Sequence, residues 1–172
     1  KHRAAQSADQ RLFVASRKVA IISGASKGIG EDIARLYAQF GANVVVSSRK
    51  QDSLDLLASD IKSKGGEATG IAAHVGDDSQ LRQLVDKTIA IYGGIDILVN
   101  NAASNPVFGP SLDCDGLAFD KIMQANVKAP FELSKLCYPS MKARGGGSVI
   151  MMSSIAGHTP DPGLGIYSVS KA

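Results

Sequence analysis

The sequence predicts an α/β fold in which a parallel sheet carries helices on both faces. Short runs of β-branched and apolar residues alternate with longer amphipathic segments, which is the pattern of buried parallel strands joined by helices. Glycines follow the amphipathic segments, where helices commonly end. This regular alternation predicts one doubly wound domain over residues 18–172.

The expected elements follow one another in a simple order. Strands are predicted at 19–23, 43–48, 68–75, 95–100 and 148–153. Helices are predicted at 29–40, 53–64 and 77–92, and the region 115–143 is expected to hold two more. Helix ends are predicted at Gly41, at 65–66, at 93–94 and at 145–147. Residues 1–17 are irregular and basic, and are interpreted as a disordered or targeting-like tail.

Composition narrows the classes of partner. The chain has 172 residues, of which 44% are hydrophobic and 20% charged, as in an ordinary globular domain. The net charge of +3 is scattered, so the sequence indicates an anionic small molecule rather than nucleic acid. No apolar run reaches the roughly 20 residues of a membrane span. Cys114 and Cys137 lie far apart without a Cys or His cluster, which argues against a disulfide framework or metal site.

A glycine-rich segment, SGASKGIG, directly follows the first expected strand and opens the first expected helix. Gly24, Gly28 and Gly30 would let the backbone approach a pyrophosphate, and the helix N-terminus would offer free N–H groups. The spacing is G-x-x-x-G-x-G, which differs from the G-x-G-x-x-G of many dinucleotide folds. The position predicts a phosphate-binding turn that also contains Ser26, Lys27 and Ile29.

The end of the second expected strand indicates which nicotinamide cofactor would bind. NAD sites place an acidic side chain there, but this chain continues with Ser48, Arg49 and Lys50. The two cations, helped by Lys27, are suited to a 2′-phosphate. The alternative is that they are solvated surface residues. We expect NADP(H) rather than NAD.

Tyr167 and Lys171 are four residues apart, so on a helix they would share one face. A neighbouring ammonium stabilises a phenolate and so turns a phenol into a usable acid near neutral pH. Ser154 lies thirteen residues before the tyrosine. Taken alone, most Y-x-x-x-K strings are exposed helix faces, and a serine at a strand end often only caps a turn.

With these motifs placed, residues 18–172 resemble the short-chain dehydrogenase/reductase family. The family signature after the fourth strand stands here as NNAA from Asn100, and the family's helix asparagine is Asn126 in QANVKAP. Within the family, NVVVSSRKQ, HVG, YGGIDILVNNAASNPVFG and RGGGSVIMMSSIAG resemble NADP-dependent carbonyl reductases and retinol dehydrogenases. The resemblance implies a Rossmann-type sheet that is cut after the start of the helix carrying Y-x-x-x-K.

The resemblance also implies roles in catalysis. Tyr167 would exchange a proton with the substrate oxygen, and Ser154 would hydrogen-bond that oxygen. Lys171 would assist Tyr167 and hold the nicotinamide ribose, and Tyr167 would also contact the cofactor. Asn126 would hold a water in the relay that returns a proton to Tyr167.

The remaining implied contacts surround the cofactor. Asn101 and Ala102 would line it beyond the fourth strand. His74 stands where family members usually carry Asp to meet the adenine amine, so that contact is expected to fall to the Val75 backbone. Ala103 replaces the last glycine of the signature and is expected to be tolerated.

Family chains continue past Y-x-x-x-K, and this sequence begins with Lys1, so we expect a truncated chain with little turnover of its own. The parent is expected to be a homotetrameric reductase of small carbonyl or alcohol substrates. A 3-oxoacyl-thioester reductase and a truncated, non-catalytic nucleotide-binding or interaction protein remain alternatives. The resemblance suggests a peroxisomal location, with mitochondrial or cytoplasmic alternatives.

Overall fold

The computed structural model describes residues 17–172, so the expected tail lies outside the described residues except for Arg17. The strands are β1 (Val19–Ser23), β2 (Asn43–Ser48), β3 (Glu67–Ala72), β4 (Ile97–Asn100) and β5 (Ser148–Met151). The main helices are α1 (Gly28–Gln39), α2 (Gln51–Ser63), α3 (Asp78–Tyr92), α4 (Gly116–Met123) and α5 (Ala129–Ala143). Shorter pieces are η2 (Ser111–Asp113), η3 (Gln124–Lys128), α6 (Ile155–His158) and α7 (Gly165–Lys171).

The sheet is parallel, with the strand order β3-β2-β1-β4-β5. The chain adds strands on one side of β1 and then crosses to the other side with β4. In such sheets, ligands bind beyond the carboxyl ends of the strands where the order reverses. The predicted doubly wound fold is confirmed.

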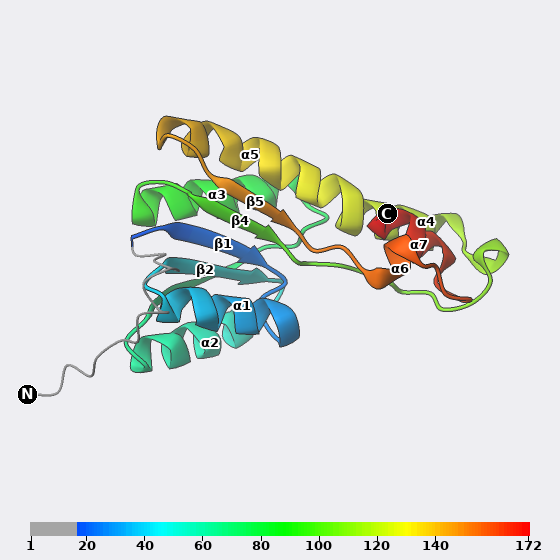
Figure 1. Cartoon of the computed structure of the whole chain (residues 1–172), viewed down its shortest axis with the longest axis horizontal. Helices are drawn as coiled ribbons and strands as arrows, with labels where there is room; N and C mark the ends of the chain where they lie inside the picture. The colour runs from blue at the N-terminus through cyan, green and yellow to red at the C-terminus, as the bar shows by residue number, and fades with distance from the viewer. Residues whose placement is uncertain (1–16) are drawn as a thin grey trace, which may run out of the picture.

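Helices cover both faces of the sheet, as Figure 1 shows. α1 and α2 pack on one face, against residues that include Ile22, Val44 and Val46. α3 and α5 pack on the other face, over Ile21 and Val45. Neighbouring strand residues thus enter opposite cores, which explains the consecutive buried apolar residues of β1 and of the middle of β2.

Three strand boundaries differ from the sequence prediction. β3 ends at Ala72 because its partner β2 ends at Ser48, which is the last residue of their register. β4 begins at Ile97, which is the first β4 residue in register with both neighbours, opposite Ala20 of β1 and Ser148 of β5. β5 ends at Met151, opposite the last residue of β4. The predicted helix ends at residues 41, 65, 93 and 145 are confirmed by glycines with positive φ.

The region 115–143 holds two α-helices, as predicted, but no loop separates them. A π-helical turn, η3, joins α4 directly to α5. Such a turn inserts an extra residue without breaking the helix. It places Asn126 on a buried part of the helix, 8% exposed.

The expectation that β5 is a buried strand is wrong. Every β5 residue is exposed, including Val149 at 44% and Met151 at 53%. β5 is the last strand of the described sheet and pairs with β4 alone among the described strands. Its apolar sequence therefore does not indicate burial within this chain.

A buried ion pair joins β1, β4 and the end of α5 at the amino ends of the strands. Asp96 is 3% exposed and accepts hydrogen bonds from Arg144 at 2.9 and 3.0 Å and from the Val19 N–H at 2.8 Å. Lys18 adds a longer contact at 3.4 Å. Burial by itself would raise the pKa of Asp96, but the bonds from Arg144 and Val19 outweigh it and hold the pKa below its usual value.

We expect Asp96→Asn to lower the free energy of unfolding at pH 7 by about 2 kcal/mol, because it leaves a guanidinium without its charge partner. The folded pKa is lowered, so the stabilisation is present above the ordinary aspartate pKa of about 4 and disappears as pH falls through the folded value. Urea unfolding from pH 7 down to about pH 3 measures this. The exposed Asp86→Asn is the control. A deficit that is independent of pH would contradict the ion-pair explanation.

Candidate active site

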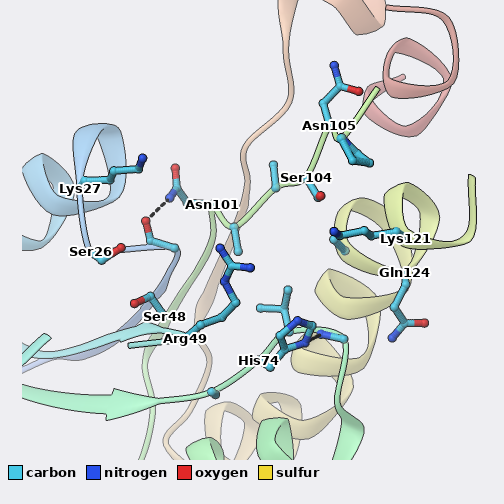
Figure 2. Close-up of a pocket in the computed structure, with 18 residues that line it drawn as sticks. Ser26, Lys27, Ser48, Arg49, His74, Asn101, Ser104, Asn105, Lys121 and Gln124 are labelled. Atoms are coloured by element: carbon cyan, nitrogen blue, oxygen red, sulfur yellow. Dashed lines mark hydrogen bonds between the residues drawn. The ribbon is translucent and has the colours of Figure 1, made fainter. Parts of the chain in front are cut away.

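A cavity of about 580 Å³ opens beyond the carboxyl ends of the strands (Figure 2). This is the size of a small-molecule site. Its walls come from the glycine-rich turn, the ends of β2 and β3, the segment after β4, and α4 with η3. The predicted cofactor residues that line it are Gly24, Ser26, Lys27, Ser48, Arg49, His74, Val75, Asn101 and Ala102.

Hydrogen bonds between the ends of β1 and β4 fix the glycine-rich turn. The Asn101 side-chain amide donates to the carbonyls of Ser23 and Gly24 at 3.0 and 3.1 Å. The Ser23 hydroxyl accepts from the N–H groups of Asn101 and Ala102, each at 3.1 Å. Asn101 thus acts first as a clamp on the turn, a role that the sequence analysis did not predict.

The glycines of the turn do different jobs. A Cβ on Gly30 would lie 2.5 Å from the Asn101 amide nitrogen and 2.6 Å from the Gly24 carbonyl oxygen. Gly24 has φ +66° and lies against the Ala102 backbone. Gly28 has φ +58°, and a Cβ there would meet nothing within 4 Å.

The N-terminus of α1 fits a phosphate group. No side chain caps this helix at Lys27, so its first N–H groups are not taken by a cap. Open space above Gly28 leaves room for a ligand to approach those groups. The turn therefore fits the phosphates of a dinucleotide.

Two of the three predicted cations reach the cavity. Lys27 and Arg49 line it, whereas Lys50 does not and instead precedes α2. Of the glycine-rich turn, Gly28, Ile29 and Gly30 also lie outside the lining, as α1 begins.

His74 and Val75 line the cavity after β3. The His74 Nδ1 accepts a hydrogen bond from the Gly76 N–H at 3.0 Å. In the neutral ring this places the proton on the other nitrogen, which can then act as a donor. His74 thus offers a donor where an aspartate would offer an acceptor.

The predicted catalytic residues do not line this cavity. Tyr167 lies in α7 and borders a separate small hollow with residues of the 105–114 segment, among them Ser111 and Cys114. The Lys171 ammonium donates to the Met152 carbonyl at 2.6 Å. Burial lowers the pKa of Lys171.

The serines at the end of β5 also have local partners. Ser154 caps α6, where its hydroxyl oxygen accepts from the Ala156 N–H at 3.2 Å. Its own O–H proton is not used in that bond and can be donated. Ser153 points elsewhere and donates to the Lys171 carbonyl at 2.6 Å. The catalytic roles of Ser154, Tyr167 and Lys171 stay predictions.

Asn126 links the cavity wall to α7. Its side-chain oxygen accepts from the Ser104 N–H at 2.7 Å, and its amide donates to the Ser104 carbonyl at 3.0 Å and the Ser170 hydroxyl at 2.9 Å. The side chain is thus occupied by protein groups. Its predicted water-holding role stays a prediction.

The far wall of the cavity contains residues that the sequence analysis missed. Ser104, Asn105, Lys121 and Gln124 line it from the segment after β4 and from α4 and η3. Lys121 and Gln124 are three residues apart, so they share a helix face. That spacing was the available signal, but it does not show which face the helix presents to the cavity.

The described part of the chain offers neither a metal centre nor a reactive buried thiol. No cluster of three or more His, Cys, Asp or Glu residues there could hold a metal ion. Cys137 is buried and free, and burial raises its pKa to about 12, which makes it a poor nucleophile. No helix in residues 17–172 is long and apolar enough to cross a membrane.

The fold and the cavity identify the class of protein. A family profile described as short chain dehydrogenase matches residues 18–172. This chain therefore belongs to the short-chain dehydrogenase family.

The chain is similar to particular members of that family. It is 45% identical over 169 residues to "Dehydrogenase/reductase SDR family member 4" of Homo sapiens, covering 98% of this chain and 61% of that protein. The Caenorhabditis elegans protein of the same name is 40% identical over 155 residues, covering 90% of this chain and 60% of that one. The chain thus spans about three fifths of the length of these curated relatives.

Two solved structures share the fold. A metagenomic short-chain oxidoreductase in complex with NADP has a TM-score of 0.87 and 34% identity, over 92% of this chain and 72% of that one. A 7α-hydroxysteroid dehydrogenase complexed with NADH and 7-oxo glycochenodeoxycholic acid has a TM-score of 0.89 and 33% identity, over 96% of this chain and 64% of that one.

We expect Gly30→Ala to destabilise the chain by about 2 kcal/mol, because the new methyl group would overlap the Asn101 clamp and the Gly24 carbonyl. Gly116→Ala is the matched control, since a Cβ on this first residue of α4 meets nothing within 4 Å. Urea unfolding of both variants measures the difference. Equal stability of the two variants would contradict the proposed packing of the turn.

Proposed function

We propose that this chain is the cofactor-binding part of an NADPH-dependent carbonyl reductase and retinol dehydrogenase, which transfers hydride between NADP(H) and a ketone, aldehyde or alcohol. The main observation in support of NADP(H) is that Lys27, Ser48 and Arg49 line the cavity, while none of its described lining residues is Asp or Glu. An arginine guanidinium can donate two parallel hydrogen bonds to the oxygens of one phosphate, which suits binding of a 2′-phosphate.

The solved structures support this choice only together with the residues at the end of β2. One holds NADP and the other NADH, yet their likeness to this chain is similar. The fold alone therefore does not select the cofactor. An acidic residue after β2 would favour NAD, and Arg49 stands there instead.

In the proposed reaction, the bound cofactor supplies or accepts the hydride. Tyr167 holds the proton for the substrate oxygen, and Ser154 has an O–H free to donate to that oxygen. The Lys171 ammonium is held by the Met152 carbonyl at 2.6 Å, and in the proposed reaction it assists Tyr167 and holds the nicotinamide ribose. Asn126 positions α7 by its bond to Ser170.

A non-catalytic nucleotide-binding protein is the second candidate. It is favoured by one observation, namely that Ser154, Tyr167 and Lys171 all lie outside the lining of the cavity. Under the first candidate, the homotetramer and the peroxisomal location implied by the family resemblance are part of the same proposal.

We expect NADPH to raise the unfolding temperature of this chain more than NADH at equal concentration. A ligand at about 100 times its Kd adds about 2.7 kcal/mol of stability, which corresponds to several degrees for a chain of this size. Arg49→Ser should remove most of the difference between the two cofactors. Arg82→Ser, on the exposed face of α3, is the control and should keep it. An equal or larger shift with NADH would contradict the cofactor assignment.

In a catalytically active form of the protein, we expect Tyr167→Phe to lower kcat by about 10³-fold, because the phenol proton is lost. The NADPH-dependent thermal shift should stay unchanged, since Tyr167 does not line the cavity. The exposed Tyr138→Phe is the control. The rate of NADPH oxidation is measured with a dicarbonyl, with retinal and with a 3-oxoacyl thioester.

The choice of substrate in this assay distinguishes the carbonyl reductase from the thioester reductase and from the non-catalytic protein. Turnover of the thioester alone would replace the carbonyl-reductase assignment. Cofactor binding without turnover of any substrate would favour the non-catalytic candidate. More than a tenth of normal kcat in Tyr167→Phe would remove Tyr167 from the mechanism.

A further inference from the structure

The cavity carries a third cation on the wall opposite Arg49. Figure 2 shows the Lys121 side chain extending from its helix toward the centre of the cavity, while Arg49 extends toward the centre from the end of β2. With Lys27, three cations line the cavity, and none of its 18 lining residues is Asp or Glu. The excess of positive charge therefore continues beyond the glycine-rich turn and β2.

Lys121 has no charge partner within the described chain. Nearby lysines do have partners, since Lys128 pairs with Asp78 at 3.2 Å and Lys135 pairs with Glu132 at 3.1 Å. Asp120 precedes Lys121 in sequence, and both border a neighbouring groove, but the two side chains form no ion pair. An ammonium that faces a cavity without a counter-ion is available to an anionic ligand.

The position of Lys121 indicates which anion it would meet. The pyrophosphate is accounted for by the glycine-rich turn and the N-terminus of α1. The Lys121 side chain points instead toward the part of the cavity where Arg49 and His74 lie. The remaining anionic group of the proposed cofactor is the 2′-phosphate of its adenosine half.

We propose that Lys121 is a specificity-determining residue, which attracts the 2′-phosphate of the cofactor from the wall opposite Arg49. This inference rests on the proposed NADP(H) site. Arg49 provides directed paired hydrogen bonds, whereas the ammonium of Lys121 acts as a point charge on a flexible stem. Together they surround the phosphate with charge from two separate walls of the cavity.

The test uses two fragments of the cofactor, 2′,5′-ADP and 5′-AMP, which differ by the 2′-phosphate. Calorimetric titration of the purified chain should show that Lys121→Gln weakens 2′,5′-ADP binding by roughly fivefold, as expected for a screened charge near a phosphate dianion. Binding of 5′-AMP should change by less than about twofold. Raising the salt concentration should shrink the difference between Lys121→Gln and the unaltered chain.

Lys87→Gln is the matched control, because it removes the same charge from an exposed position in α3 that does not line the cavity. It should leave both affinities unchanged. Thermal unfolding of Lys121→Gln should match the unaltered chain, since the side chain is exposed.

Each other outcome has one meaning. Equal weakening of both ligands would show that Lys121 contacts the adenosine itself, which overturns the inference. Unchanged affinities in Lys121→Gln, with a loss in Arg49→Ser, would overturn it while leaving the NADP(H) site intact. If the unaltered chain binds 2′,5′-ADP no tighter than 5′-AMP, the proposed cofactor and the role of Lys121 are both wrong.

Discussion

The cavity depends on the hydrogen bonds that hold the end of β1 to the end of β4. Ser23 and Asn101 are 78 residues apart in sequence. The Ser23 hydroxyl accepts a hydrogen bond from the Asn101 backbone N–H, and the Asn101 side-chain amide donates one to the Ser23 carbonyl. Each bond contributes only about 1 kcal/mol net. Together they fix the turn at the point where the strand order reverses, so that Lys27, at the uncapped N-terminus of α1, lines the cavity.

Much of the fold could be predicted from the sequence, because burial on two faces demands continuous apolar strands. Val44, Val45 and Val46 are all fully buried for this reason. The ends of strands were less predictable, since β3 stops where β2 provides no further partner. Burial of β5 failed as a prediction because it depends on what lies beyond the sheet edge, which the strand's own sequence does not contain.

The residues of the cavity were likewise only partly predictable from the sequence. Gly24, Arg49 and Asn101 could be predicted to lie together, since parallel topology brings the carboxyl ends of strands to one edge. The orientation of Lys121 could not, because its spacing from Gln124 shows that the two share a helix face but not what that face meets. The hydrogen bond from Lys171 to Met152 could not be predicted either, because its acceptor is a backbone carbonyl, which every residue carries whatever its side chain.

Charged side chains are arranged differently at the amino ends and at the carboxyl ends of the strands. At the amino edge, the buried carboxylate of Asp96 is matched by Arg144 and Lys18, so that its charge is satisfied within the chain. At the carboxyl edge, Lys27, Arg49 and Lys121 face a cavity that contains no carboxylate among its described lining residues. The mild net charge of +3 thus conceals a local excess of cations at the cavity. Because like charges placed together raise the energy of the folded chain, this excess is best explained by an anionic ligand that stabilises it when bound.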